Sequence, residues 1–289
     1  MGIVFALASL FSWGFGDFFI QKSSRALSIW KTLFFISFAG GVVLFPFVWR
    51  EIGLFLFDGR TALLFFIATV VTTFAALFDF EALKEGKIAI VEPIFGLELL
   101  VTLGLSIGVW GEILSGKQVI IIALIFIGIM SAATIHYSHL RYHRRIFERG
   151  VVCAGLAAIG MGLVNFLLGV LSQMTSPLFS IWVTHSLIAL ICFFYLLLRG
   201  EFSNIINDFQ QHARIILSMS LFDNAAWIFY AFAVRHIPIS IAITLSESYI
   251  ALAVLLGFFV NRERLRAHQI IGVVVTVIGI IALSSITSG

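Results

Sequence analysis

Apolar segments about 20 residues long, the length that a helix needs to cross a bilayer, follow one another along almost the whole chain. This pattern is the signature of transmembrane helices. The alternation of apolar and polar residues over units of about ten residues, typical of an outer-membrane barrel, is absent from the sequence. Only 11% of the residues are charged, compared with about a quarter in a soluble domain. The sequence therefore predicts an all-α polytopic membrane protein.

Ten transmembrane helices fit these segments, with an uncertainty of a few residues at each end. The predicted spans are 3–20, 29–49, 61–83, 88–110, 118–135, 151–172, 178–198, 212–234, 238–260 and 268–286. The connections between them are too short to fold as domains. The first span has neither a basic leader nor a clear small-residue cleavage site, which predicts a retained helix rather than a signal peptide.

The sequence also repeats itself, which is a sign of internal duplication. The segment "GEILSGKQVIIIALIFIGI" aligns with "NRERLRAHQIIGVVVTVIGI" at a constant offset of 151 positions. At this offset Glu112 meets Glu263 and Gly128 meets Gly279. The matched glycines predict close helix contact. Two five-helix repeats, 1–149 and 150–289, account for the pattern.

Because five is an odd number, the second repeat must enter the membrane in the opposite orientation to the first. Basic residues collect in cytoplasmic loops, so equivalent loops on opposite sides should differ in charge. The loop after the first span contains Lys22, Arg25 and Lys31, whereas its counterpart "SQMTSP" contains none. The sequence therefore predicts an inverted repeat, an arrangement characteristic of secondary transporters.

Three segments resemble the EamA-type repeat of the drug/metabolite transporter superfamily. They are "EALKEGKIAIVEPI", the "GEILSGKQVIIIALIFIGI" that follows it, and "SESYIALAVLLGFFVNRERLRAHQIIGVVVTVIGI". The resemblance covers nearly the whole chain in two copies and implies a ten-helix transporter. It does not name the substrate, because the superfamily moves amino acids, sugars, nucleotide sugars, drugs and other metabolites.

Two features depart from the pattern of that superfamily. Ile250 stands where the second repeat often has a proline, which predicts a milder helix break in the ninth span. Loops that follow odd-numbered spans hold 14 of the 18 Lys and Arg residues, which places both termini away from the cytoplasm. The superfamily's ten-helix members are usually drawn with cytoplasmic termini, so the orientation stays open.

Besides Glu81 at the end of a span, six acidic residues lie inside predicted spans, where an ionised carboxylate costs on the order of 3 kcal/mol at mid-bilayer. Asp223 is the central residue of the eighth span, and Glu98 and Glu247 lie near the centres of the fourth and ninth. These two spans are repeat equivalents, and inverted-repeat transporters bind substrate at such a midplane interface. Asp17 and Asp79 lie nearer helix ends, from which they could reach the interface.

The candidate substrate or ion pathway extends beyond the three central acids. Pro93 and Gly96 interrupt the fourth span, which predicts a hinge or partly unwound helix, with a simple proline kink as the alternative. Aromatic side chains deep in their spans could line a pocket for an organic substrate or pack in the core. A structural alternative for the acids is a hydrogen-bonded network with Asn and Ser residues. The complete candidate set is Glu98, Asp223, Glu247, Glu92, Asp79, Asp17, Asn165, Trp13, Trp227 and Tyr249. His185 is interpreted as a packed histidine rather than a proton relay.

These features predict a secondary active transporter of small organic metabolites or drugs, integral to the cell membrane. We expect an exporter coupled to protons or to substrate exchange, with a nutrient importer as the alternative within transport. A membrane-embedded lipid-modifying enzyme is the alternative from a different class. It is disfavoured because no G-x-S-x-G or HExxH pattern is present, so we expect no catalytic residue.

The expected partners are a small-molecule substrate, the lipid bilayer and a coupling proton, and no nucleic acid. The sequence has no phosphate-binding glycine loop, and Cys153 and Cys192 lie inside predicted spans. We therefore expect no cofactor and no metal.

Gly104 and Gly108 form a GxxxG motif, which is typical of close helix packing within a bundle or in a dimer. The chain is expected to be a monomer or a homodimer.

Overall fold

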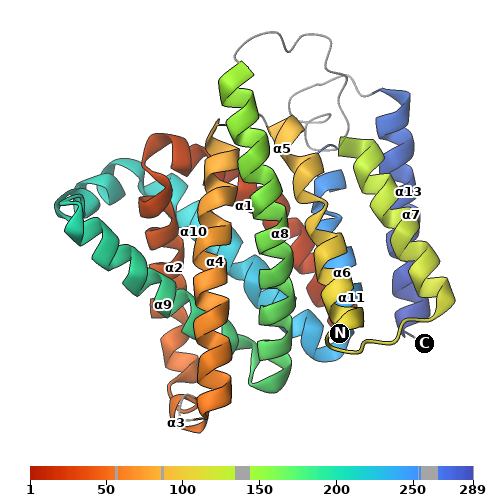
Figure 1. Ribbon diagram of the computed structural model, residues 1–289, viewed down its shortest axis with the longest axis horizontal. Coiled ribbons are helices and arrows are strands. Elements are labelled where there is room, and N and C mark those ends of the chain that lie inside the picture. The colour runs from red at the N-terminus through yellow and green to blue at the C-terminus, as the bar shows by residue number, and fades with distance from the viewer. Residues whose placement is uncertain (56–57, 86–87, 134–143, 253, 255–265, 289) are drawn as a thin grey trace.

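The computed structural model describes residues 1–288 except 56–57, 86–87, 134–143, 253 and 255–265, and within these residues the fold is helical without strands (Figure 1). The elements are α1 (Gly2–Ala26), α2 (Ile29–Val48), α3 (Ile52–Phe55), α4 (Gly59–Glu85), α5 (Ile88–Phe95), α6 (Glu98–Gly108), α7 (Gly116–Ala133), α8 (Arg144–Met174), α9 (Pro177–Leu198), the short 3₁₀ helix η1 (Phe202–Asn204), α10 (Ile205–His236), α11 (Ile239–Glu247) and α13 (Ala267–Ser288). In the described part of the chain, eight helices are long and apolar enough to cross a membrane. The prediction of an all-α polytopic membrane protein is confirmed.

The fourth and ninth predicted spans are the two that consist of shorter helices. In the fourth, Gly96 and Leu97 form a turn between α5 and α6, whereas Pro93 lies inside α5. In the ninth, Ser248 alone separates α11 from the helical residues that follow it. The break in the ninth span is thus the milder of the two, as its missing proline predicts. The part of this span at 253 and 255–260 lies outside the described residues.

Two helices differ from their predicted bounds for identifiable reasons. α1 continues six residues beyond the predicted end at residue 20. Its polar last turns are bonded to neighbouring helices, since Gln21 donates to the Leu83 carbonyl at 2.9 Å. α10 begins seven residues before the predicted start and bends at His212, whose φ of −119° and ψ of 19° are not helical. The predicted start therefore coincides with the bend.

Side chains are distributed as a lipid environment requires, with apolar groups outside and many small polar groups inside. Phe66, Val43 and Ile278 are more than half exposed, whereas Thr102 and Ser180 are fully buried. The buried hydroxyl groups mostly donate to backbone carbonyls, as Thr102 does to Gly162 at 2.9 Å. Because lipid offers no hydrogen bonds, such internal bonds are what keeps these groups inside the bundle.

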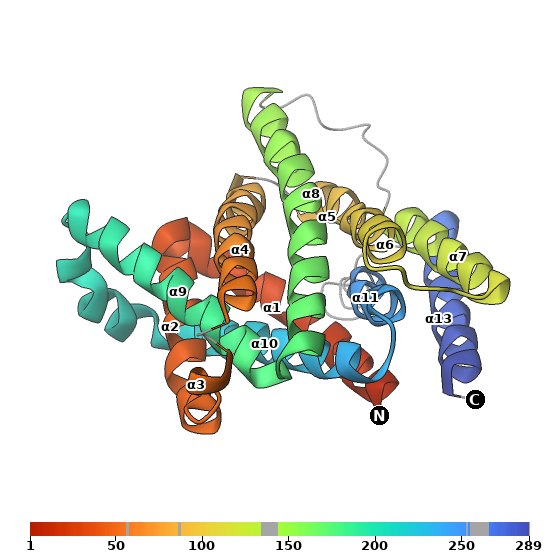
Figure 2. The same ribbon diagram turned by 60° about the horizontal axis from the view of Figure 1, so that its bottom comes forward.

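Helices of the first half of the chain pack mainly against helices of the second half. The most extensive contacts join α1 to α10, α4 to α8, α2 to α9 and α7 to α13. Figure 2, seen from another direction, shows α7 and α13 together at one flank of the molecule. The two repeats therefore interlock within one bundle instead of standing side by side.

The fifth helices of the two repeats, α7 and α13, cross antiparallel at glycines. A Cβ added at Gly272 would lie 2.4 Å from the Ala132 backbone nitrogen and 2.6 Å from the Gly128 carbonyl oxygen. A Cβ added at Gly279 would lie 2.4 Å from an Ile125 side-chain carbon. The contact expected at the matched glycines is therefore present.

The GxxxG motif behaves differently from the matched glycines. Neither Gly104 nor Gly108 has an atom within 4 Å of an added Cβ in the described part of the chain. The expectation that this motif packs inside the bundle is not met.

Contacts at the helix ends show that equivalent helices run in opposite directions. α1 ends where Arg25 donates to the Lys84 carbonyl at the end of α4. We refer to this as the basic end of the bundle, and Arg149 pairs with Glu81 there. α8, the counterpart of α1, ends at the opposite end, where the side chain of Gln173 donates to the Val234 carbonyl at 2.9 Å. Both chain termini lie at that opposite end (Figure 1).

This arrangement predicts that positions 25 and 176 face opposite sides of the membrane. We expect Arg25→Cys and Ser176→Cys, each in a Cys153→Ser/Cys192→Ser background, to react with a membrane-impermeant thiol reagent from opposite sides. The charge distribution further predicts that position 25 lies in the cytoplasm. Labelling of both cysteines from one side would rule out the inverted repeat. Labelling of position 25 from outside would instead support cytoplasmic termini.

The start of α11 is fixed by an acidic side chain from the first repeat. Glu112 accepts hydrogen bonds from the backbone nitrogens of Ile239 and Ser240, the latter at 3.0 Å, and from the Ser240 hydroxyl. A carboxylate is favoured at a helix N-terminus because it meets unpaired N–H groups and the positive end of the helix dipole. Glu112 thereby ties the first repeat to the helix that ends at Glu247.

We expect Glu112→Ala to destabilise the protein by about 2 kcal/mol, since it removes charge-assisted hydrogen bonds worth about 1.5–3 kcal/mol. Thermal unfolding in detergent, followed by size-exclusion fluorescence, measures the change as a lower melting temperature. Glu201→Ala is the matched control, because Glu201 is exposed and its side chain makes no hydrogen bond within the described residues. Equal melting temperatures for the two variants would contradict this role of Glu112.

Candidate functional site

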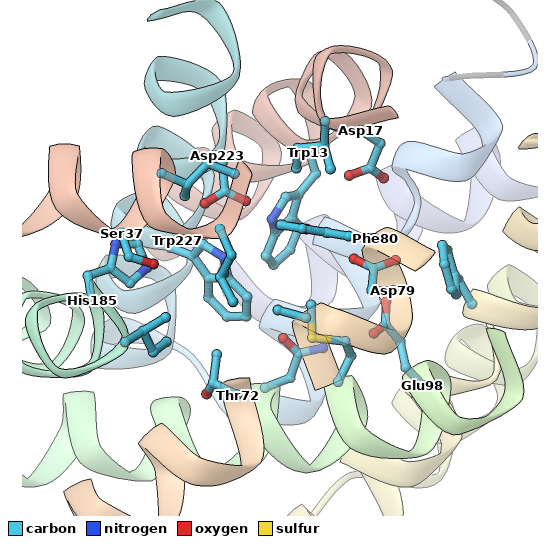
Figure 3. A pocket seen from close by; sticks show the side chains of 18 of the residues that line it. Trp13, Asp17, Ser37, Thr72, Asp79, Phe80, Glu98, His185, Asp223 and Trp227 are labelled. Atoms are coloured by element: carbon cyan, nitrogen blue, oxygen red, sulfur yellow. The ribbon is translucent and has the colours of Figure 1, made fainter. Parts of the chain in front are cut away.

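A polar cavity of about 70 Å³ lies at the centre of the bundle, between helices of both repeats (Figure 3). Its lining residues are Trp13, Asp17, Ile20, Leu33, Ile36, Ser37, Thr72, Ala76, Asp79, Phe80, Phe95, Glu98, Met161, Asn165, His185, Ile188, Asp223, Trp227, Glu247 and Tyr249. Among the described residues, nine of the ten predicted pathway residues line this one cavity. The tenth, Glu92, belongs to α5, and its side chain lies outside the described residues.

Five carboxyl groups on five different helices converge on this cavity. Asp17 comes from α1, Asp79 from α4, Glu98 from α6, Asp223 from α10 and Glu247 from α11. The last four side chains are at most 9% exposed. Acids that are far apart in the sequence are thus gathered around a small space away from bulk water.

Asp17 and Asp79 belong to the cavity rather than to the membrane interface. Their positions near the ends of the predicted spans placed them within reach of the surface, and the structure corrects this expectation. α1 extends to Ala26 and α4 to Glu85, so both acids lie well inside their helices. Figure 3 shows Asp79 and Glu98 directed toward the same part of the cavity.

Glu98 and Glu247 are neighbouring carboxyl groups that come from the two repeats and meet at the cavity. Two carboxyl groups bond to each other only when one of them carries a proton. Glu98 is the first residue of α6 and Glu247 the last residue of α11. The helix dipole favours a negative charge at the first position and a neutral group at the second. The broken helices therefore present a site that can hold one proton between two acids.

The position of Glu98 is set by close packing of α8 against α6. A Cβ added at Gly162 would lie 2.7 Å from the Glu98 carbonyl oxygen and 2.5 Å from Val101 Cβ. Thr102 reinforces this contact by donating to the Gly162 carbonyl. Because only a glycine fits at this point, α8 reaches the first turn of α6 and fixes the direction of the Glu98 side chain.

Aromatic side chains form one wall of the cavity and pack against one another. The ring centroids of Trp13 and Trp227 are 5.3 Å apart at 87°, an edge-to-face contact, and those of Trp13 and Tyr249 are 6.4 Å apart. Tyr249 also lies beside Asp17, and the Trp227 side chain lies beside Asp223. These aromatic side chains therefore both line the cavity and pack against one another in the core.

His185 lines the cavity and is held by an amide side chain. Asn224 donates from Nδ2 to the carbonyls of Ile36 at 3.1 Å and Ser220 at 2.8 Å. Its Oδ1 therefore faces His185 Nδ1, 2.9 Å away, and accepts a hydrogen bond from it. This arrangement fixes the ring of His185 and leaves Nε2 as the atom that can exchange protons.

Sequence reasoning did not place His185, Ser37 and Thr72 in the pathway. A histidine in an apolar span is commonly a packed residue, and serine or threonine in a helix commonly bonds to its own backbone. Thr72 does so, donating to the Ala68 carbonyl at 2.7 Å. The available signal for His185 was its depth within a span whose other ionisable residues are Cys192 and Tyr195.

Two comparisons, with protein families and with solved structures, place this architecture among known proteins. The family described as "EamA-like transporter family" matches residues 1–134 and 148–285. Comparison with curated proteins gave no match. Among solved structures 28 chains match. One of them is a crystal structure described only as that of a protein, with a TM-score of 0.69 and 13% sequence identity, covering 100% of this chain and 99% of the other. At that identity the likeness shows the fold alone.

Proposed function

The chain belongs to the EamA-like transporter family, and from this premise we propose that it is a secondary active exporter of small organic metabolites or drugs. Transport is driven by protons or by substrate exchange, across the cell membrane. The observation that carries the proposal is the central cavity, whose five carboxyl groups come from both repeats and include a carboxyl pair.

The geometry of the cavity supports a mechanism of alternating access. Small-molecule sites usually measure about 300–1,000 Å³, whereas this cavity measures about 70 Å³. The helices must therefore move apart on one side before an organic substrate enters. Breaks at Gly96–Leu97 and at Ser248 lie beside Glu98 and Glu247. Broken helices at the centre of a bundle are where inverted-repeat transporters bind substrate and move.

The buried acids support proton coupling. A carboxylate without a partner is costly in this environment, so each acid is neutralised by a proton or by a bound cation. When the cavity opens toward the side of lower proton concentration, an acid releases its proton. A bound cation must then neutralise that acid before the cavity closes again. Glu98, Asp223 and Glu247 are the residues that we propose to alternate between proton and substrate.

Metabolite profiling of cells with and without the protein, inside and outside, tests the direction and the substrate. We expect a set of organic metabolites to fall inside the cells and rise in the medium. Purified protein in liposomes loaded with these metabolites should then exchange them for external label. A rise inside the cells would identify a nutrient importer instead. Unchanged profiles together with no exchange in liposomes would refute transport.

A further inference from the structure

We propose that the substrate is an organic monocation with N–H donors, such as a protonated amine or guanidine, which binds against Asp79 and Asn165. This inference rests on the proposed transport function and names the substrate class of the same cavity.

The charge of the cavity lining is the first observation. Among its described residues, every ionisable side chain other than His185 and Tyr249 is an acid. A carboxylate in a low-dielectric site attracts a cation strongly and repels an anion. When a monocation enters and one proton leaves, the charge of the cavity is unchanged. Such an exchange moves substrate without building up charge in the middle of the membrane.

The second observation is a pair of buried polar side chains that face the cavity without a hydrogen bond. Asp79 is 9% exposed and Asn165 is 2% exposed, and neither side chain bonds to another described residue. Asn165 accepts from the Tyr230 hydroxyl only through its backbone carbonyl. Asp79 instead has the carboxyl groups of Asp17, Glu98 and Asp223 as its charged neighbours. Both side chains line the cavity, so their oxygens can accept N–H donors from a ligand there.

The aromatic wall is the third observation. The perpendicular rings of Trp13 and Trp227 both line the cavity, opposite Asp79 in Figure 3. A ring face attracts a cation through its quadrupole, with tryptophan the strongest of the aromatic side chains. An amine or guanidine can therefore donate its N–H groups to Asp79 and Asn165 and place its cationic face on an indole. A neutral substrate would gain neither the charge pairing with Asp79 nor the contact between a cation and an indole face, and an anion would be repelled by the acids.

Four labelled probes of similar size separate charge from hydrogen bonding. Benzylguanidinium is a cation with N–H donors, benzyltrimethylammonium is a cation without donors, phenylalanine is a zwitterion and benzenesulfonate is an anion. Uptake is measured in liposomes that contain the purified full-length protein and have an acidic interior. We expect benzylguanidinium to enter at least about tenfold faster than the other three.

Asp79→Asn tests the residue itself, since it removes the charge and keeps the shape. Loss of one ionic hydrogen bond corresponds to about a 10- to 100-fold weaker half-saturation for benzylguanidinium. The matched control is Glu81→Gln on the same helix, whose carboxylate pairs with Arg149 at the basic end. Glu81→Gln should keep parental half-saturation. Size-exclusion chromatography of both variants establishes that each is folded.

The outcomes separate this inference from the transport function. Uptake of phenylalanine or benzenesulfonate in preference to benzylguanidinium overturns the substrate class and leaves transport standing. No uptake of any probe overturns the class as well, and the metabolite exchange described above then decides whether transport stands. Benzylguanidinium uptake that is unchanged in Asp79→Asn overturns the assignment of Asp79.

Discussion

We expect Glu98→Gln and Asp223→Asn to reduce proton-coupled transport about 10- to 100-fold without reducing the amount of folded protein. Each change removes one charged hydrogen-bonding group, worth about 1.5–3 kcal/mol, and keeps the size and polarity of the side chain. Glu98 can then no longer share a proton with Glu247, and Asp223 can no longer balance the charge of a substrate. Transport of the substrate identified by profiling, measured in liposomes over a range of pH, should become slow and nearly independent of pH.

Glu81→Gln is the control for this experiment, because Glu81 is not part of the cavity lining and pairs with Arg149 at the basic end of the bundle. It should retain parental transport and the parental pH profile. Parental rates and profiles in both Glu98→Gln and Asp223→Asn would show that the central acids are structural. A larger defect in Glu81→Gln would move the functional site from the centre of the bundle to its mouth.

A leucine at Gly128 or Gly272 should prevent most of the protein from folding. A new Cβ at Gly272 would lie 2.4 Å from the Ala132 nitrogen, and one at Gly128 would lie 2.9 Å from the Gly272 carbonyl oxygen. These are backbone atoms, so α7 and α13 would have to separate along their whole length. Overpacking alone costs about 1–3 kcal/mol, and loss of this helix contact adds to that. The yield of monodisperse protein on fluorescence size-exclusion chromatography measures the effect.

Gly155→Leu is the matched control for the contact between α7 and α13, because no atom of the described residues lies within 4 Å of a Cβ added at Gly155. Its yield should equal that of the parental protein. A normal yield of Gly128→Leu with an altered substrate preference would show that this glycine has a role in specificity. In that case the contact between α7 and α13 is not essential for folding.

Hydropathy was sufficient to predict the helices, because a transmembrane helix is defined by the solvent around it. It failed where polar residues continue a helix inside the protein. The end of α1 resembles a loop in the sequence, yet Ser23 is buried beside Thr32, 3.1 Å away, and Gln21 bonds to α4. Those partners come from other helices, so no local pattern in α1 could reveal them.

The candidate site was predictable to the extent that buried charge is rare in membranes. Depth alone selected Glu98, Asp223 and Glu247, because an acid at mid-bilayer requires a compensating function or partner. The sequence did not show that Asp79 faces the same cavity, since the direction of a side chain depends on how helices pack. His185 was not predicted to line the cavity, for a related reason. Its environment depends on Asn224 from a different helix.

The interlocking of the two repeats has a consequence for biogenesis. The ribosome delivers α1 to α7 to the membrane before their partners α8 to α13 have been made. In that interval the Ser9 hydroxyl lacks the Ala226 carbonyl, and Thr102 lacks the Gly162 carbonyl. Buried acids such as Asp79 face lipid without their enclosing helices. The nascent first half therefore needs shelter from insertion machinery or chaperones, and an arrested or truncated chain presents polar intramembrane surface that quality-control proteases can recognise.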